Sequence, residues 1–258
     1  MQFGETTWLR RDGHVAVVEF DRPPNNFVSV ELVRDIADAL EAADAAREVR
    51  ASLLCSVGKN FSAGADLASP SGVGGSGMSG IGPLYEQAVR LFSAKKPIVA
   101  AVQGAAVGAG LGLALVADFR VAAPEARFAA NFVKLGFHPG FAITHTLPRL
   151  VGEQKAALMC LTGRRIKGEE ALAWGLADAL APLEQVREEA LALCREIAEA
   201  APLAVVSTRA TLRGALADAV RRQTAHELKE QTWLRETADF AEGVRSVNER
   251  RPGAFVGA

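Results

Sequence analysis

The feature that most constrains the fold is the longest apolar stretch of the chain, Pro97 to Val116, which is broken by small residues. Four of its positions are glycine, and Gln103 interrupts it near the middle. A membrane-spanning helix needs about 20 consecutive apolar residues, and glycine weakens a helix. The stretch therefore predicts a buried strand over 97–102, a turn over 104–110 and a short helix over 111–116.

A similar pattern occurs earlier in the chain. The apolar run 51–57 predicts a second buried strand, and the small residues of 58–65 predict the loop that follows it. Before these, 14–20 is rich in β-branched residues and predicts another strand. Ser29 is placed to cap a helix whose apolar residues recur at helical spacing over 32–43.

The remaining elements complete an α/β pattern. We expect a helix over 84–94, a strand over 118–123, strand-like interruptions near Ile166 and over 177–180, a helix over 183–200 and a last helical region over about 217–248. Buried strands separated by helices favour parallel βαβ units. The length of 258 residues fits one large domain, with a core over 1–200 and a helical region over 201–258.

Composition excludes several classes of partner. The formal net charge is −1 with both signs scattered, so we expect no nucleic-acid partner. The three cysteines (Cys55, Cys160 and Cys194) are far apart, which predicts reduced thiols in a cytoplasmic protein. The four histidines lack metal-ligand spacing, so we expect no metal. Residues 1–11 contain no apolar segment typical of a signal peptide, and the Gly/Ser-rich segment 69–82 predicts a mobile loop.

Two segments of small residues, 60–67 and 104–110, are suited to exposing backbone N–H groups to a ligand. Each follows a predicted buried strand, and the second precedes a helix whose first N–H groups lack partners. Such donors stabilise negative charge that develops on oxygen. Either segment alone is also typical of a tight turn or a packing contact. A dinucleotide site is not indicated, because Leu113 stands where the third glycine of that fingerprint would be.

Taken together, these segments resemble the crotonase (enoyl-CoA hydratase/isomerase) superfamily over nearly the whole chain. The motifs that carry the resemblance are NFSAGADL at 60–67, IVAAVQGAAVGAGLGLALVAD at 98–118, DRPPNNF at 21–27, FVKLG at 132–136, LPRLVG at 147–152 and EGV at 242–244.

The resemblance implies a crotonase-like spiral of ββα units and a helical C-terminal oligomerisation region at 201–258, giving a trimer or a dimer of trimers. It implies an acyl-CoA thioester as substrate, with no cofactor beyond its CoA. The backbone N–H groups of Ala65 and Ala109 would stabilise the thioester enolate. Residues matched to CoA and substrate contacts are Asn26, Phe27, Val28, Ala63, Asp66, Leu67, Gly112, Phe132, Arg250 and Phe255.

The chain departs from the family at its acid and base. The two hydratase glutamates fall at Gly112 and Phe132, and an isomerase aspartate falls near Gly140. We consider three hypotheses: that His138 or His145 serves as the base, that an anion or water occupies the space beside Gly112, or that the reaction is not hydration.

A non-catalytic acyl-CoA-binding role is the alternative to an enzyme, because both hydratase glutamate positions are empty. Phe132, an apolar ring in place of a carboxylate, predicts an aromatic or alicyclic acyl group. Tyr85, the only tyrosine, is a candidate to line the pocket.

Overall fold

The computed structural model describes residues 1–65 and 81–258. Its main feature is a seven-stranded sheet in the order β1-β2-β3-β4-β5-β7-β10. The strands from β3 onward are parallel, whereas β1, β2 and β3 are antiparallel neighbours. The bounds are Gln2–Phe3 (β1), Thr7–Asp12 (β2), Val15–Phe20 (β3), Ala51–Ser56 (β4), Ile98–Val102 (β5), Phe119–Ala122 (β7) and Ala179–Leu180 (β10).

A second, three-stranded sheet supports the candidate site. It has the order β6-β8-β9, with β6 parallel to β8 and β9 antiparallel to β8. Its strands are Ala105–Val107 (β6), Arg127–Ala129 (β8) and Arg165–Lys167 (β9). Because β6 follows β5 after a short turn, the chain passes directly from the large sheet to the small one.

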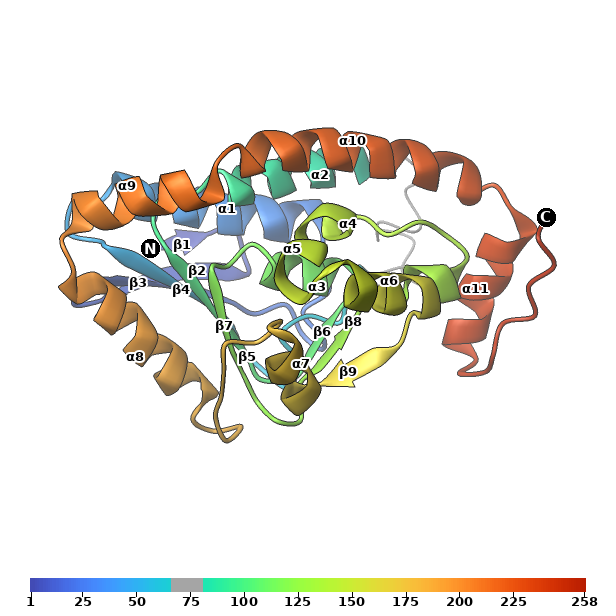
Figure 1. Ribbon diagram of the computed structural model, residues 1–258, viewed down its shortest axis with the longest axis horizontal. Helices are drawn as coiled ribbons and strands as arrows, with labels where there is room; N and C mark the ends of the chain where they lie inside the picture. The colour runs from blue at the N-terminus through green and yellow to red at the C-terminus, as the bar shows by residue number, and fades with distance from the viewer. Residues whose placement is uncertain (66–80) are drawn as a thin grey trace.

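Helices cover both faces of the large sheet (Figure 1). Helix α8 packs on β4 and β5, whereas α1 packs on β3 and α2. Helix α10 lies across α2, and α11 lies near the C-terminus. The helices are Val30–Ala45 (α1), Ile81–Phe92 (α2), Ala109–Ala114 (α3), Ile143–Thr146 (α4), Pro148–Val151 (α5), Glu153–Thr162 (α6), Gly168–Trp174 (α7), Val186–Glu199 (α8), Pro202–Arg213 (α9), Leu216–Leu234 (α10) and Ala238–Asn248 (α11), with a 3₁₀ helix at Asn131–Leu135.

The α/β class and the main strands predicted from sequence are confirmed. Ser29 caps α1 by accepting a hydrogen bond from the Leu32 N–H at 3.2 Å. The strands β1, β2, β6 and β8 were not predicted. The helical region expected over 217–248 consists of two helices, because α10 ends at Leu234 and Thr237 caps α11. Most of the predicted mobile loop 69–82 lies outside the described residues.

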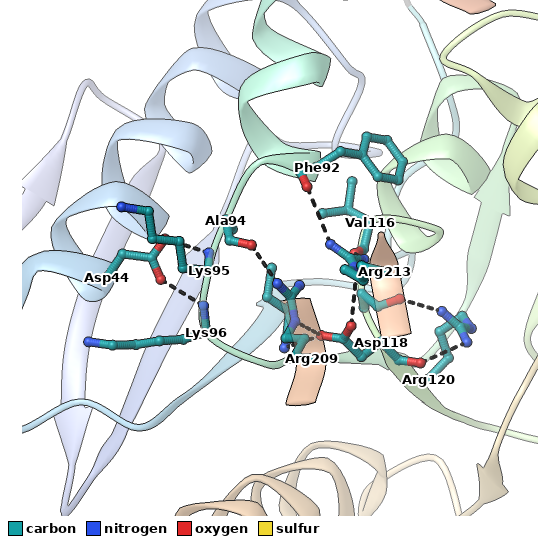
Figure 2. A network of polar contacts seen from close by, with 12 residues as sticks. Asp44, Phe92, Ala94, Lys95, Lys96, Val116, Asp118, Arg120, Arg209 and Arg213 are labelled. Atoms are coloured by element: carbon teal, nitrogen blue, oxygen red, sulfur yellow. Dashed lines mark hydrogen bonds and ion pairs between the residues drawn. The ribbon is translucent and has the colours of Figure 1, made fainter. Parts of the chain in front are cut away.

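A buried polar network attaches α9 to the sheet (Figure 2). Asp118, directly before β7, accepts hydrogen bonds from the Ile98 N–H and from Arg209 Nε, each at 2.8 Å. Arg213 Nε lies 3.1 Å from the same carboxylate. One aspartate therefore balances two arginines of α9 where that helix meets the core.

Within residues 1–65 and 81–258, no helix is long and apolar enough to cross a membrane. The same residues contain no cluster of three or more His, Cys, Asp or Glu side chains able to bind a metal.

Candidate active site

Two loops meet at one edge of the large sheet. They follow β4 and β5, which are parallel neighbours, so both loops leave the sheet on the same side. The first loop then runs beside β6. The Ser62 N–H donates to the Ala105 carbonyl at 2.8 Å, and the Val107 N–H donates to the Ser62 carbonyl at 3.1 Å. The two sequence-predicted loops are thus joined by backbone hydrogen bonds.

Residues after β3 fix the first loop from the other side. Asn26 is 3% exposed, and its Nδ2 donates to the carbonyls of Val57 and Asn60 at 2.8 and 2.9 Å. The Val28 N–H donates to the Gly64 carbonyl at 2.8 Å. These two residues, matched to CoA contacts by resemblance, are held within the loop scaffold.

Glycine lets the two loops approach each other closely. Gly64 has φ +97°, and a Cβ there would lie 2.7 Å from the Val107 carbonyl oxygen and 3.9 Å from the Ala109 nitrogen. Gly108 has φ +55°, again in the region that favours glycine. Any larger residue at position 64 would separate the loops.

The residues that follow these glycines, Ala65 and Ala109, line one cavity of about 240 Å³. Ala109 is the first residue of α3. Among the described residues, neither its N–H nor that of Ala65 donates a hydrogen bond to another group. The two residues predicted to supply backbone donors therefore lie at the wall of one cavity.

The rest of the wall is largely apolar and aromatic. Its other lining residues are Phe27, Ala63, Gly64, Ile81, Leu84, Tyr85, Gly108, Asn131, Phe132, Leu135, Phe137, Gly140, Phe141, Gln231, Arg235, Val247 and Asn248. Within the part of the chain that the structure describes, the lining contains no aspartate, glutamate or histidine. Arg235 is the one charged side chain in this set.

The three positions matched by resemblance to family carboxylates lie at or beside this cavity. Phe132 and Gly140 line it directly. A Cβ at Gly112 would lie 2.6 Å from Cβ and Cδ1 of Phe141, another lining residue. The Phe141 side chain therefore occupies the space directly beside Gly112, which the hypothesis assigned to an anion or water, and that hypothesis stays a prediction.

We expect Gly112→Ala to lower the free energy of unfolding by about 1–3 kcal/mol, as overpacking of a core does. Combining it with Phe141→Ala is expected to cost less than the sum of the two single variants, because the ring that obstructs the new methyl group is gone. Chemical denaturation of the four proteins measures this coupling. Strict additivity would show that Phe141 does not fill this space.

The two candidate histidines lie outside the cavity lining. His138 Nδ1 is 2.7 Å from the Pro139 carbonyl oxygen. The His138 ring packs edge-on against the ring of His226, with the two ring centroids 5.9 Å apart. His145 Nε2 is buried without a partner among the described residues. Burial and the charges of Arg149 and Arg222 lower the pKa of His145.

Other predicted residues are divided between the cavity and the surface. Phe27, Ala63 and Tyr85 line the cavity. Phe255 is 44% exposed in the C-terminal tail and lines a separate depression beside α10. Arg250 is also exposed. Asp66 and Leu67 lie outside the described residues.

Sequence reasoning missed the polar wall contributed by α10. The Tyr85 hydroxyl donates to Gln231 Oε1 at 2.9 Å, and Gln231 Nε2 donates to the His138 carbonyl at 2.7 Å. A Cβ at Gly140 would lie 1.9 Å from the Tyr85 hydroxyl oxygen, so this glycine makes room for the pair. Of this pair, only Tyr85 was indicated by the sequence, as the single tyrosine of the chain.

Comparison with known proteins agrees with this geometry. The family model described as "Enoyl-CoA hydratase/isomerase" matches residues 10–258. A Thermus thermophilus protein named as a candidate enoyl-CoA hydratase is 38% identical over 94% of this chain and 98% of its own length.

Solved structures are also similar to this chain. An enoyl-CoA hydratase/isomerase from Pseudoalteromonas atlantica has a TM-score of 0.86 at 29% identity and covers 98% of this chain and 100% of its own. An enoyl-CoA hydratase from Mycobacterium avium subsp. paratuberculosis has a TM-score of 0.83 at 27% identity. The match covers 98% of this chain and 99% of that structure.

Proposed function

This protein belongs to the enoyl-CoA hydratase/isomerase family of the crotonase superfamily, and from that premise we propose that it is an enzyme that stabilises the enolate of an acyl-CoA thioester. The proposed oxyanion hole consists of the backbone N–H groups of Ala65 and Ala109. The observation that carries the proposal is that both residues line one cavity and that neither N–H donates elsewhere among the described residues.

The chemistry follows from these two donors. Addition to a conjugated thioester, or removal of its α-proton, places negative charge on the thioester oxygen. Each donor of such a hole contributes roughly 2.7–4 kcal/mol in the transition state. The apolar walls strengthen this effect, because charge interactions grow as the local dielectric falls. The relatives bear the names of enzymes, which favours catalysis over a purely binding role.

The aromatic wall favours an apolar, flat acyl group. Phe132 and Phe137 pack edge-to-face with their ring centroids 5.5 Å apart. A Cβ at Gly108 would lie 3.9 Å from Phe132 Cζ, so the tip of this ring lies close to the proposed oxyanion hole. We therefore propose an aromatic or alicyclic acyl thioester as substrate. A complex in which Phe132 turns away from the thioester would contradict this.

We also propose that the protein assembles as a trimer or a dimer of trimers through residues 201–258. Exposed apolar side chains on α9 support this, because Leu203 and Leu212 are 84% and 76% exposed. Phe255 would reach CoA only in such an assembly or through movement of the tail. The three cysteines are free, which supports a reducing compartment such as the cytoplasm. The proposed reaction needs no metal and no cofactor beyond the CoA of the substrate.

The first test is hydration of crotonyl-CoA, followed by loss of the enoyl-thioester absorbance, with calorimetric binding beside it. We expect the protein to bind the thioester. We expect it to hydrate crotonyl-CoA about 10²–10⁴-fold more slowly than a relative with both glutamates, because general acid–base assistance has that magnitude. Absence of acyl-CoA binding would overturn the proposed function.

The hypothesis that His138 or His145 acts as the base is tested by His138→Ala and His145→Ala in the same assay. Since neither ring lies in the cavity lining, we expect each variant to retain turnover within about tenfold, less than the loss of a general base causes. A collapse of turnover in one variant alone, with binding retained, would identify that histidine as the base.

A further inference from the structure

Glu227 is a buried carboxylate whose hydrogen bonds all go to the start of α4. It lies in α10, is 0% exposed, and faces Ala142, which precedes α4, and Thr144, in the first turn of that helix. Its Oε2 accepts from the Ala142 N–H at 2.7 Å. Its Oε1 accepts from the Thr144 hydroxyl at 2.5 Å and from the Thr144 N–H at 3.3 Å. A single carboxylate thus binds three donors from two alternate residues.

The loop that it binds has an unfavourable backbone. Phe141 and Ala142 have φ +61° and +58°, values that side chains with a Cβ rarely adopt. Such residues persist only where the surroundings hold them. Glu227 supplies that support at Ala142, the second of the two residues, and thereby fixes the direction of the Phe141 ring.

The position of Phe141 has a consequence for the cavity. Its ring lines the cavity and fills the space beside Gly112, where the family has a catalytic carboxylate. We propose that Glu227 is a positioning residue that holds Phe141 against Gly112 and so determines which acyl groups the cavity accepts. We call the contacts by which Glu227 holds Phe141 the clamp. The substrate class in this inference rests on the proposed function, whereas the geometry of the clamp does not.

The ionisable surroundings of Glu227 do not compensate its charge. Tyr85 on α2 and Cys160 on α6 have pKa values raised by burial and by the Glu227 charge, that of Cys160 to about 11, so both are neutral at neutral pH. The pKa of His145 on α4 is lowered by burial and two arginines. Burial raises the pKa of Glu227 itself to about 7, against the lowering effect of its hydrogen bonds.

This raised pKa predicts a pH dependence with a definite sign. The folded protein binds the Glu227 proton more tightly than the unfolded chain does, whose ordinary pKa is 4.5. The resulting contribution to stability is complete below that value and is lost as the pH rises from about 4.5 to about 7. Glu227→Gln is expected to abolish this part of the pH dependence.

The experiment compares cinnamoyl-CoA with crotonyl-CoA, as an aryl and a small acyl probe, in binding and in kcat and KM. Glu227→Ala is expected to change the ratio of the two affinities about tenfold, equivalent to about 1.4 kcal/mol. Binding of free CoA should stay unchanged. In the wild type the ratio of the two affinities should differ between pH 6 and pH 8, because these values lie on either side of the Glu227 pKa of about 7. In Glu227→Gln the ratio should be the same at both pH values. Asp218→Asn, at an exposed site on the same helix, is the control.

A second pair of variants keeps the test decisive if Glu227→Ala does not fold. Thr144→Val removes the hydroxyl donor and should shift the affinity ratio in the same direction as Glu227→Ala. Thr144→Ser keeps the hydroxyl and should keep the wild-type ratio. Variants that lose stability but keep the wild-type ratio at every pH would overturn the proposal. If the wild type binds neither thioester, the proposed function fails. The clamp is then tested alone by whether a crystal structure of Glu227→Gln shows Phe141 displaced.

Discussion

Gly64→Ala is expected to reduce turnover of an enoyl-CoA by at least about 100-fold, the loss associated with removing one oxyanion donor. The added Cβ would lie 2.7 Å from the Val107 carbonyl oxygen, so the loops that carry Ala65 and Ala109 would have to separate. Proline alone deletes a backbone donor, but it also fixes φ, so displacing the loop tests the donors without that added restriction. The measurement is kcat/KM with calorimetric binding of free CoA beside it.

The same loop offers a matched control. Gly58 also has a positive φ, +87°, but a Cβ there would meet nothing within 4 Å. Gly58→Ala therefore carries the backbone strain without the collision, and we expect it to retain turnover within about tenfold. If Gly64→Ala were no slower than Gly58→Ala, the contact between the two loops would not be needed for catalysis.

The large sheet could be predicted because its central strands are buried on both faces. The six residues of β3 and of β4 are all buried, which produces the continuous apolar runs seen in the sequence. β2 lies next to the edge strand and reads TWLRRD, with three charged residues, so it has no such signal. β6 has only three residues within a glycine-rich turn, and its pairing with β8 depends on distant residues.

The candidate site divides in the same way. That Ala65 and Ala109 lie at one cavity could be expected from two segments of small residues that each follow a buried strand, whereas their role as donors stays a prediction. The far wall of the site could not be predicted: Gln231 in α10, Arg235 directly after that helix and Val247 in α11 lie more than 100 residues away in the chain and show no local pattern. Nor does the sequence indicate that Phe141 and Ala142 adopt left-handed conformations, because the Glu227 carboxylate that accepts the Ala142 N–H lies 85 residues beyond Ala142 in the chain.

Asp118→Ala is expected to lower the free energy of unfolding by about 3–5 kcal/mol, the usual cost of removing one partner of a buried ion pair. Asp118 contacts both Arg209 and Arg213, whose side chains are only 8% and 13% exposed (Figure 2). Burial lowers the pKa of Arg213 to about 10, so it remains charged at neutral pH. Without the carboxylate, two buried guanidinium groups of α9 would face each other uncompensated.

Two further variants separate this explanation from a general loss of packing. Asp12→Ala removes an exposed partner of Arg195 and is expected to cost less than about 1 kcal/mol. Adding Arg209→Met to Asp118→Ala removes one of the two uncompensated charges while keeping an apolar side chain of similar length. We therefore expect the double variant to be more stable than Asp118→Ala alone. Urea denaturation measures all four proteins. A double variant that is less stable than Asp118→Ala would show that Arg209 contributes through its Ala94 hydrogen bond and its packing, and that relief of its charge is the smaller effect.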